Sequence, residues 1–329
     1  MMGEMKIREY PWVAFYIEFA NKLLAFTNDR KPLVDIIKSV YEQIDINLPK
    51  LEKDGEVFDI DPFTLFGLFN KGITTENRIK FITVFAKKMG VTTAVPTEFE
   101  GVPVLNNQKA TYYFIGETGR NDDDIDNLWK VFTYAVEYAD KKTDSSKVEF
   151  IKYYDMCLKQ KGVRWNITMG LYWVRPYTYI NLDSRNRGFI SNAANTSAAF
   201  VDMLPNFDNV PSGEEYLKLC KESVDLVESG DYKYGSLPEL SASAWSTAKV
   251  DGDVRTTHYW LYAPGENAYK WEKFYKSGTM AIGWSDIGDL SAYSTREDMR
   301  KAMADAWGNE KSYKISSLAT WQFANEIKQ

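Results

Sequence analysis

The sequence is poor in histidine and cysteine, with only His258, Cys157 and Cys220 among 329 residues. A single histidine excludes mechanisms and metal centres that need two, such as a His-rich zinc site or a two-histidine iron centre. The cysteines lie far apart and form no CxxC pair. We therefore expect a stability that does not depend on disulfides and a reducing compartment.

Long apolar runs and an excess of positive charge are also missing. No run of about 18 consecutive apolar residues occurs, so no membrane span is expected. The first 22 residues carry charges throughout and lack a secretory apolar stretch, which predicts a cytoplasmic protein. Lys and Arg number 40 against 46 for Asp and Glu, a formal charge of −6. A surface that is basic overall is excluded, and only local basic patches remain.

Motifs of common catalysts are absent too. There is no GxxxxGK[ST], GxSxG, HExxH or GxGxxG sequence. We expect no catalytic residue, no metal site and no cofactor in this chain. One alternative is a magnesium-dependent nuclease that uses Asp122, Asp124 and Asp126. An acidic run ahead of an amphipathic helix is more often a helix cap that complements the dipole.

Aromatic residues are in excess, at 15% of the chain. Much of the first 235 residues shows apolar residues at three- and four-residue steps, which predicts amphipathic helices. Asp61, Thr74 or Thr75, and Thr295 are predicted N-caps, and Gly90 is a predicted helix end.

The pattern changes near residue 236. Residues 236–257 are small, polar and aperiodic, which predicts a linker. HYWLYAPG (258–265) alternates like a strand, and TMAIGW (279–284) reads as a second strand. We therefore expect an α+β protein with a mainly α-helical domain over 1–235 and a small α/β module over 258–329.

A basic segment stands out in this acidic chain. Residues 151–190 carry seven cations and two carboxylates, a net charge of +5. The guanidinium groups of arginines are able to bind phosphates, and the faces of aromatic rings are able to stack on bases. The alternative is an aromatic core in which Asp183 pairs with a neighbouring arginine. The candidate phosphate ligands are Arg164, Arg175, Arg185 and Arg187, and the interleaved rings are Trp165, Tyr172, Trp173, Tyr177 and Tyr179.

A second group of rings lies near the carboxyl end. Trp260 and Tyr262 share one face of the expected strand. Trp284 ends the next strand and precedes the polar Ser285 and Asp286. Rings that converge beside a carboxylate or hydroxyl are able to sandwich an extruded base and bond its edge. A small hydrophobic core is the alternative.

The carboxyl-terminal residues resemble the EVE-like module of the PUA superfamily found at the front of McrB-type restriction proteins. The matching features are YW followed by APG, Trp271, GW at 283–284, GDL at 288–290 and the helix from Leu318 to Ile327. The segments DIDPFTLFGLFNKGIT, PVLNN and WNITMGLYWVRPYTYINLDSRNR, with the helix after IDNLW, resemble the helical region of the same proteins.

The resemblance implies recognition of double-stranded DNA that carries methylated or otherwise modified bases. It implies Trp260, Tyr262 and Trp284 as the base pocket, with Ser285 or Asp286 at the base edge. Partners would be an AAA+ motor in cis, which uses GTP or ATP and Mg²⁺, and a nuclease subunit in trans.

No motor motif occurs here, and the family pattern stops at Gln329. We therefore expect a truncated, incomplete EVE-like module in a chain that does not itself cleave DNA. The alternative function is an interaction or oligomerisation scaffold of an AAA+ restriction complex, which fits the net charge of −6 better.

Overall fold

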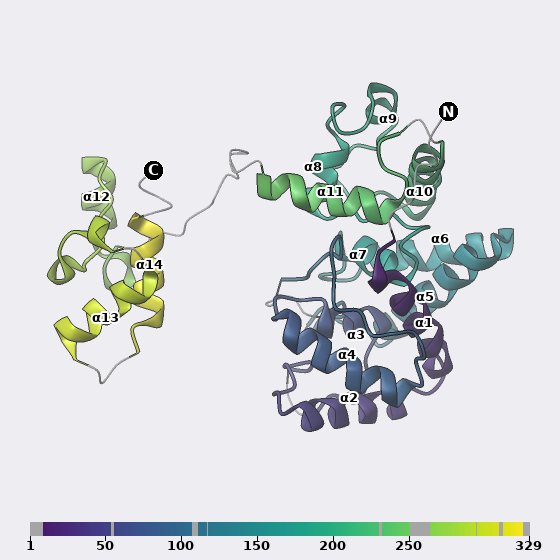
Figure 1. Cartoon of the computed structure of the whole chain (residues 1–329), viewed down its shortest axis with the longest axis horizontal. Coiled ribbons are helices and arrows are strands. Elements are labelled where there is room, and N and C mark those ends of the chain that lie inside the picture. The colour runs from purple at the N-terminus through teal and green to yellow at the C-terminus, as the bar shows by residue number, and fades with distance from the viewer. Residues whose placement is uncertain are drawn as a thin grey trace. The chain divides into compact units, whose positions relative to one another are not determined.

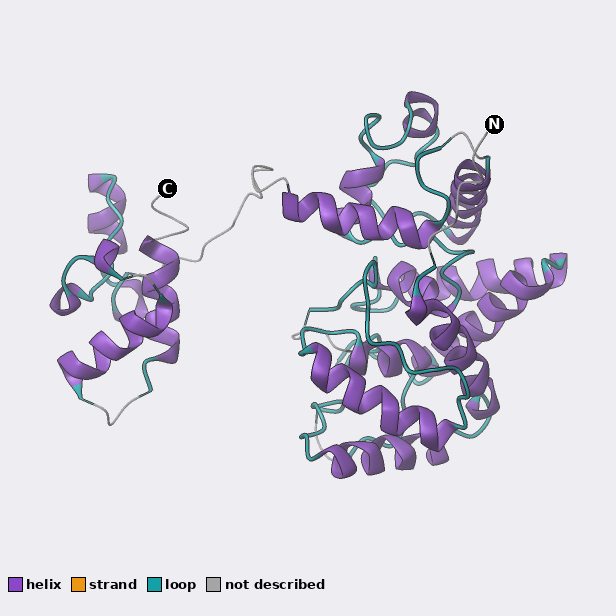
Figure 2. Cartoon of the chain, viewed as in Figure 1, coloured by secondary structure: helices purple, strands orange, loops and turns teal. Residues whose placement is uncertain are grey.

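The computed structural model describes residues 9–53, 56–106, 111–116, 118–229, 232–250, 264–293, 295–308 and 312–324. The chain divides into two compact units, Met1–Val254 and Arg255–Gln329, called here the N-terminal and C-terminal units. Helices joined by loops build both units (Figure 1 and Figure 2). Across the described ranges, the one β-type pairing is an isolated bridge between Lys71 and Leu105.

The N-terminal unit surrounds two short helices that have no polar face. Every residue of α3 (Pro62–Phe69) is buried, and so is every residue of α7 (Asn166–Val174) except Asn166 at its start. A helix that is apolar on all sides is stable only inside a core. The other helices are α1 (Pro11–Leu23), α2 (Lys31–Ile44), α4 (Thr75–Met89), α5 (Asp124–Lys141), α6 (Asp144–Leu158), α8 (Ser184–Ile190), α9 (Ala198–Asp202), α10 (Gly213–Glu228) and α11 (Leu237–Val250), with a 3₁₀ turn η1 (Leu24–Phe26).

Helices α3 and α7 approach closely at Gly170. A Cβ atom at this position would lie 2.5 Å from Cδ1 of Phe63. One turn further along α3, Phe66 stacks on Trp173 of α7 with ring centroids 6.2 Å apart. Helices α1, α4 and α5 pack around this pair. The apolar stripes of these outer helices therefore face the same core.

Buried rings also fasten the loops of this unit. The indole N–H of Trp12 donates to the carbonyl of Glu100 at 2.9 Å, and that of Trp173 donates to the carbonyl of Pro103 at 3.1 Å. The Tyr172 hydroxyl donates to the carbonyl of Gly101 at 3.2 Å. A buried ring donor without an acceptor destabilises the fold, so these bonds hold the 99–105 loop against the core.

The C-terminal unit is smaller and has few buried side chains. Its apolar core comprises Ile287, Met299 and Met303. Helices α13 and α14 pack together, and the turn η4 packs on α13. Its elements are η3 (Glu266–Ala268), α12 (Trp271–Ser277), η4 (Ser285–Ile287), η5 (Leu290–Ala292), α13 (Arg296–Trp307) and α14 (Lys314–Gln322).

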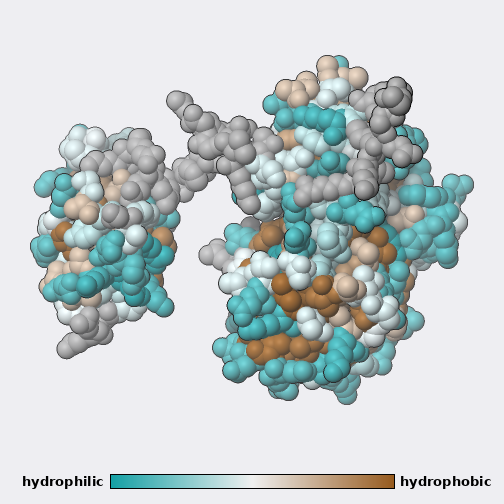
Figure 3. All heavy atoms as spheres, in the orientation of Figure 1, coloured by the Kyte–Doolittle hydropathy of each residue, from teal (hydrophilic) through white to brown (hydrophobic). Residues whose placement is uncertain are grey.

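The surface of both units is mostly hydrophilic on the face drawn in Figure 3. Hydrophobic patches on that face lie over α2 and α4 of the N-terminal unit. Among the described residues, no helix is both long and apolar enough to cross a bilayer.

The expected α+β fold is wrong, because the structure describes helices, turns and loops and no strand. Residues 279–284, expected as a strand, form a loop in which Met280 is 38% exposed. Six residues of mixed apolar character do not distinguish a strand from a loop, and no neighbouring strand is described with which they could pair. The other expected strand lies at 258–265, of which residues 258–263 are outside the described residues. The expectation of an EVE-like α/β module is contradicted with it.

Helix α11 occupies most of the segment 236–257 that we expected to be a linker. It packs against α8 and α10 through buried residues that include Leu237 and Leu240. Tertiary packing thus stabilises a helix that could not be predicted from the small, polar residues of this segment.

The predicted caps are confirmed. Asp61 accepts the backbone N–H groups of Phe63 and Thr64 at the start of α3. Thr74 caps α4, whose C-terminal Gly90 adopts a left-handed φ of 68°. At α13, Thr295 and Asp298 form a reciprocal capping box.

Asp61 differs from the other two N-caps because it is an acidic residue and is fully buried. Besides the two backbone N–H groups it accepts the Thr64 hydroxyl, whose oxygen accepts the N–H of Tyr112 at 2.8 Å. Burial raises the pKa of Asp61 to about 6, although these hydrogen bonds oppose the shift. The folded protein therefore holds a proton on Asp61 more tightly than the unfolded chain does.

We predict that this group makes the protein less stable as the pH rises from about 4 to about 6. The stabilisation is complete below the unfolded pKa of 3.8 and is lost as the pH passes through the folded pKa. Its full range is about 3 kcal/mol. Asp61→Asn keeps an N-cap and should flatten this part of the pH profile in urea unfolding, whereas Asp45→Asn, at an exposed carboxyl, should not. Parallel profiles for the wild type and Asp61→Asn would contradict the prediction.

Candidate phosphate-binding site

The predicted base pocket is only partly within the described residues. Trp260 and Tyr262 lie outside them. Trp284 is half-buried and contacts Trp307 of α13, with ring centroids 5.6 Å apart. The indole N–H of Trp307 donates to Oδ2 of Asp286 at 3.0 Å, and Ser285 bonds to the other carboxylate oxygen at 3.4 Å. Sequence reasoning missed Trp307, which takes up part of the hydrogen-bonding capacity of Asp286.

The predicted phosphate ligand Arg175 has an internal role instead. It is 5% exposed and forms a two-pronged ion pair with Asp140, at 2.8 and 2.7 Å. It also donates to the side-chain oxygen of Asn21 and to the carbonyl of Val174. With its donors committed inside the fold, Arg175 is unsuited to a phosphate contact, and we correct that expectation.

Two other predicted arginines meet in one pocket, called here the Trp–Arg pocket. Its volume is about 410 Å³, within the range of small-molecule sites. The loop after α4, the start of α7, helix α8 and helix α11 supply its walls. The lining residues are Val104, Leu105, Asn106, Trp165, Asn166, Met169, Asp183, Ser184, Arg185, Arg187 and Trp245.

Each arginine of the Trp–Arg pocket lies over the ring of a tryptophan. The guanidinium carbon of Arg185 is 4.0 Å from the ring centroid of Trp245, and that of Arg187 is 3.8 Å from the centroid of Trp165. Phe207 packs against Trp165 in a T-shaped arrangement, with ring centroids 6.1 Å apart. Stacking of this kind fixes the plane of a guanidinium while its N–H edge stays able to donate.

The two arginines differ in how far their donors are engaged. Arg187 is half-buried and donates to the carbonyl of Leu182 at 2.5 Å. Burial lowers the pKa of Arg187, and the nearby Asp183 carboxylate opposes that shift. Arg185 is exposed and forms no ion pair or hydrogen bond with any described residue. Arg185 is thus the arginine with donors available for a ligand.

Two further features of the Trp–Arg pocket favour an anion. The indole N–H of Trp245 is buried and has no acceptor among the described residues. The carboxylate of Asp183 is already engaged, since it caps α8 through Asn186 and accepts from Asn181. The lining therefore carries two guanidinium cations against one carboxylate that is already engaged. The chemical group that matches them is an oxyanion such as a phosphate.

The remaining predicted ligand, Arg164, is exposed and does not line the Trp–Arg pocket. The rings of Tyr172, Trp173 and Tyr179 are buried in the core, so they do not form a binding surface. The expectation of an aromatic core is therefore confirmed for these three rings, whereas phosphate binding by the segment stays a prediction. What the sequence pattern missed is Trp245, which comes from the segment expected to be a linker.

Two of the three carboxylates of the alternative nuclease site have other partners, while Asp122 is exposed. Asp124 is buried and accepts the backbone N–H of Asn121 at 2.9 Å. Asp126 forms an ion pair with Arg30 at 2.6 Å. In the part of the chain that the structure describes, no three such side chains are placed to hold a metal ion together.

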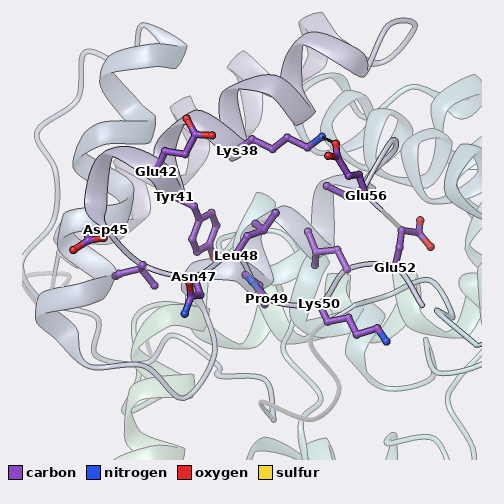
Figure 4. Close-up of a pocket in the computed structure, with 13 residues that line it drawn as sticks. Lys38, Tyr41, Glu42, Asp45, Asn47, Leu48, Pro49, Lys50, Glu52 and Glu56 are labelled. Carbon is purple, nitrogen blue, oxygen red and sulfur yellow. Dashed lines mark hydrogen bonds and ion pairs between the residues drawn. The ribbon is translucent and has the colours of Figure 1, made fainter. Parts of the chain in front are cut away.

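A second pocket, of about 580 Å³, has the opposite charge (Figure 4). It lies between α2 and the loop that follows it, and we call it the α2 groove. Tyr41, Leu48 and Pro49 give it an apolar floor, while Glu42 and Asp45 lie at one end. Four carboxylates and two lysines line it, and one lysine, Lys38, is already paired with Glu56 at 2.7 Å. An anion is a poor fit for this groove.

A family model described as a domain of unknown function (DUF8425) matches residues 12–247, more than half of the chain. The chain belongs to this family. A second model, also a domain of unknown function (DUF8426), matches residues 260–329. Each match falls within one of the two compact units. No curated protein and no solved structure matches the chain.

We predict that Arg175→Ala destabilises the protein without weakening DNA binding. The change leaves Asp140 without its partner and removes several hydrogen bonds to a charged group, which costs about 1–3 kcal/mol. Arg175→Lys should lose a similar amount because a lysine lacks the two-pronged geometry. Urea unfolding measures both. Arg164→Ala, at an exposed position, serves as the control, and a stable Arg175→Ala protein that no longer binds DNA would contradict the assignment.

Proposed function

We propose that this protein binds DNA through phosphate contacts in the Trp–Arg pocket and does not itself cleave it. The observation that carries the proposal is the pair of guanidiniums stacked on Trp165 and Trp245. Arg185 supplies donors that no described residue engages. Phosphate contacts give most of the affinity in DNA binding and make it depend on salt.

The resemblance to McrB-type proteins adds detail to the proposal. It makes the chain the recognition part of a modification-dependent restriction complex, with a motor and a nuclease in other domains or chains. Trp284 is then the proposed base contact, half-buried beside Trp307. A cytoplasmic location belongs to the same proposal, since DNA and a reducing environment are found together there.

A protein-interaction scaffold is the second candidate, and the α2 groove favours it. Glu42 and Asp45 are exposed and form no ion pair with a described residue. An apolar floor with free carboxylates at one end suits a protein segment that carries both apolar and basic side chains. A scaffold that does not bind DNA would show no salt dependence of DNA affinity.

We predict that Arg185→Ala weakens binding to a fluorescein-labelled duplex about tenfold. It should also reduce the slope of log affinity against log salt by about one, because one phosphate contact is lost. Arg185→Lys keeps the charge but not the stacking plane, so an intermediate loss is expected. Fluorescence anisotropy over a salt series provides the measurement.

Arg300→Ala removes an arginine of α13 whose side chain is 41% exposed and lies outside the Trp–Arg pocket; it is the control and should bind as the wild type does. Equal affinity and equal salt slope for wild type and Arg185→Ala would refute the role of the pocket. If the wild type itself binds no duplex at low salt, DNA binding is refuted and the scaffold is favoured.

For the scaffold, the prediction concerns an amphipathic peptide of alternating lysine and leucine. The double change Glu42→Gln with Asp45→Asn removes two negative charges from the α2 groove. It should lower the affinity of the protein for this peptide several-fold, most clearly at low salt. The second change keeps a residue that tolerates the left-handed φ of 55° at position 45. Glu222→Gln with Glu228→Gln on α10 removes the same charge elsewhere. Equal effects of the two double variants would show that the groove is not the binding site.

A further inference from the structure

Three aromatic rings stand exposed around α12 in the C-terminal unit. Tyr269 is 70% exposed, Trp271 46% and Tyr275 72%. Trp271 and Tyr275 lie one turn apart on the helix and stack on each other, with centroids 5.7 Å apart and ring planes 22° apart. No residue of α12 is buried. Exposed rings on a helix that contributes no buried residue are not explained by the core of this unit.

The local backbone holds these rings in place. At Gly265, with a φ of +78°, an added Cβ atom would lie 2.4 Å from the ring of Tyr269. The ring of Tyr269 therefore rests on the backbone there, and only glycine permits that approach. The backbone N–H of Lys270 donates to the carbonyl of Pro264 at 3.1 Å, and Gly278 ends α12 in the left-handed conformation. The rings are thus presented on an ordered turn and helix.

Positive charge surrounds the same rings. Lys270, Lys273 and Lys276 are exposed, and the ammonium of Lys270 lies 5.4 Å from the centroid of the Tyr269 ring. Lys276 forms a long ion pair with Glu272 at 3.7 Å, while Lys273 has no ion pair with a described residue. Ring faces interleaved with lysines match unpaired bases joined by phosphates.

We propose that the α12 surface, formed by Tyr269, Trp271, Tyr275 and the three lysines, is a stacking platform for single-stranded DNA. The rings stack on successive unpaired bases, and the lysines neutralise the phosphates between them. The inference rests on the proposed DNA binding and deepens it, because it specifies that the C-terminal unit binds single-stranded DNA. It rests on residues other than those of the Trp–Arg pocket.

The test compares variants of the full chain with a fluorescein-labelled oligothymidine and with a duplex. Trp271→Ala should weaken binding to the single strand about tenfold, and adding Tyr275→Ala should weaken it further, since each ring stacks on one base. Trp271→Phe keeps a ring face and should retain most of the affinity. Phe58→Ala removes a ring that is 71% exposed in the N-terminal unit, and it is the matched control.

The variants separate this inference from the proposed function. A loss of single-strand affinity in Trp271→Ala, with unchanged binding in Phe58→Ala, supports the platform whatever Arg185→Ala does to the duplex. Wild-type single-strand affinity in the double variant overturns the platform, even if Arg185→Ala impairs duplex binding. A wild-type chain that binds no oligothymidine at low salt also overturns it.

Discussion

The fold of the N-terminal unit depends on the close packing of α3 against α7. Both helices lack a polar face, so they are stable only when other elements cover them on all sides. The contact between Gly170 and the ring of Phe63 leaves no room for a side chain at position 170. Helices α1, α4 and α5 then pack around this pair. The amphipathic patterns of these three helices fit that arrangement, because each helix has one apolar face toward the core.

This packing also determines where the Trp–Arg pocket forms. Trp165 immediately precedes α7, so its position follows from where α7 enters the core. The Leu182 N–H donates to the hydroxyl of Thr168 in α7, which fixes the chain just before α8 and its two arginines. Helix α11 supplies the other ring by packing on α8. The pocket is thus assembled at the edge of the core from segments that are distant in sequence.

Local signals in the sequence were sufficient for the predicted helix ends, though not for every helix. Asp61, Thr74 and Thr295 cap helices because a side-chain oxygen two or three residues ahead of a free N–H is a local arrangement. The strand expected at 279–284 was wrong because six residues carry too little periodicity to decide. Helix α11 escaped notice because packing against α8 and α10, rather than its own composition, stabilises it.

The candidate site was predictable only as a basic segment. Arg175 and Arg185 look equivalent in the sequence, yet one is buried against Asp140 and the other is exposed. That difference comes from residues 35 and 154 positions away, Asp140 and Asn21, which no local pattern reveals. The partner ring Trp245 comes from a different helix for the same reason. The arginines could be identified from the sequence, whereas the fold determines which of them has N–H donors that no other residue engages.

The hydrogen bonds from aromatic side chains to the 99–105 loop have a consequence for how the N-terminal unit unfolds. Three separate indole and hydroxyl groups of the core hold carbonyls of that loop. The loop is therefore unable to open by itself while the core stays intact, because each detachment would leave a buried donor without an acceptor. Detachment of this loop and unfolding of the core are therefore one cooperative event. A protease that cuts between Glu100 and Pro103 would thus report on global unfolding.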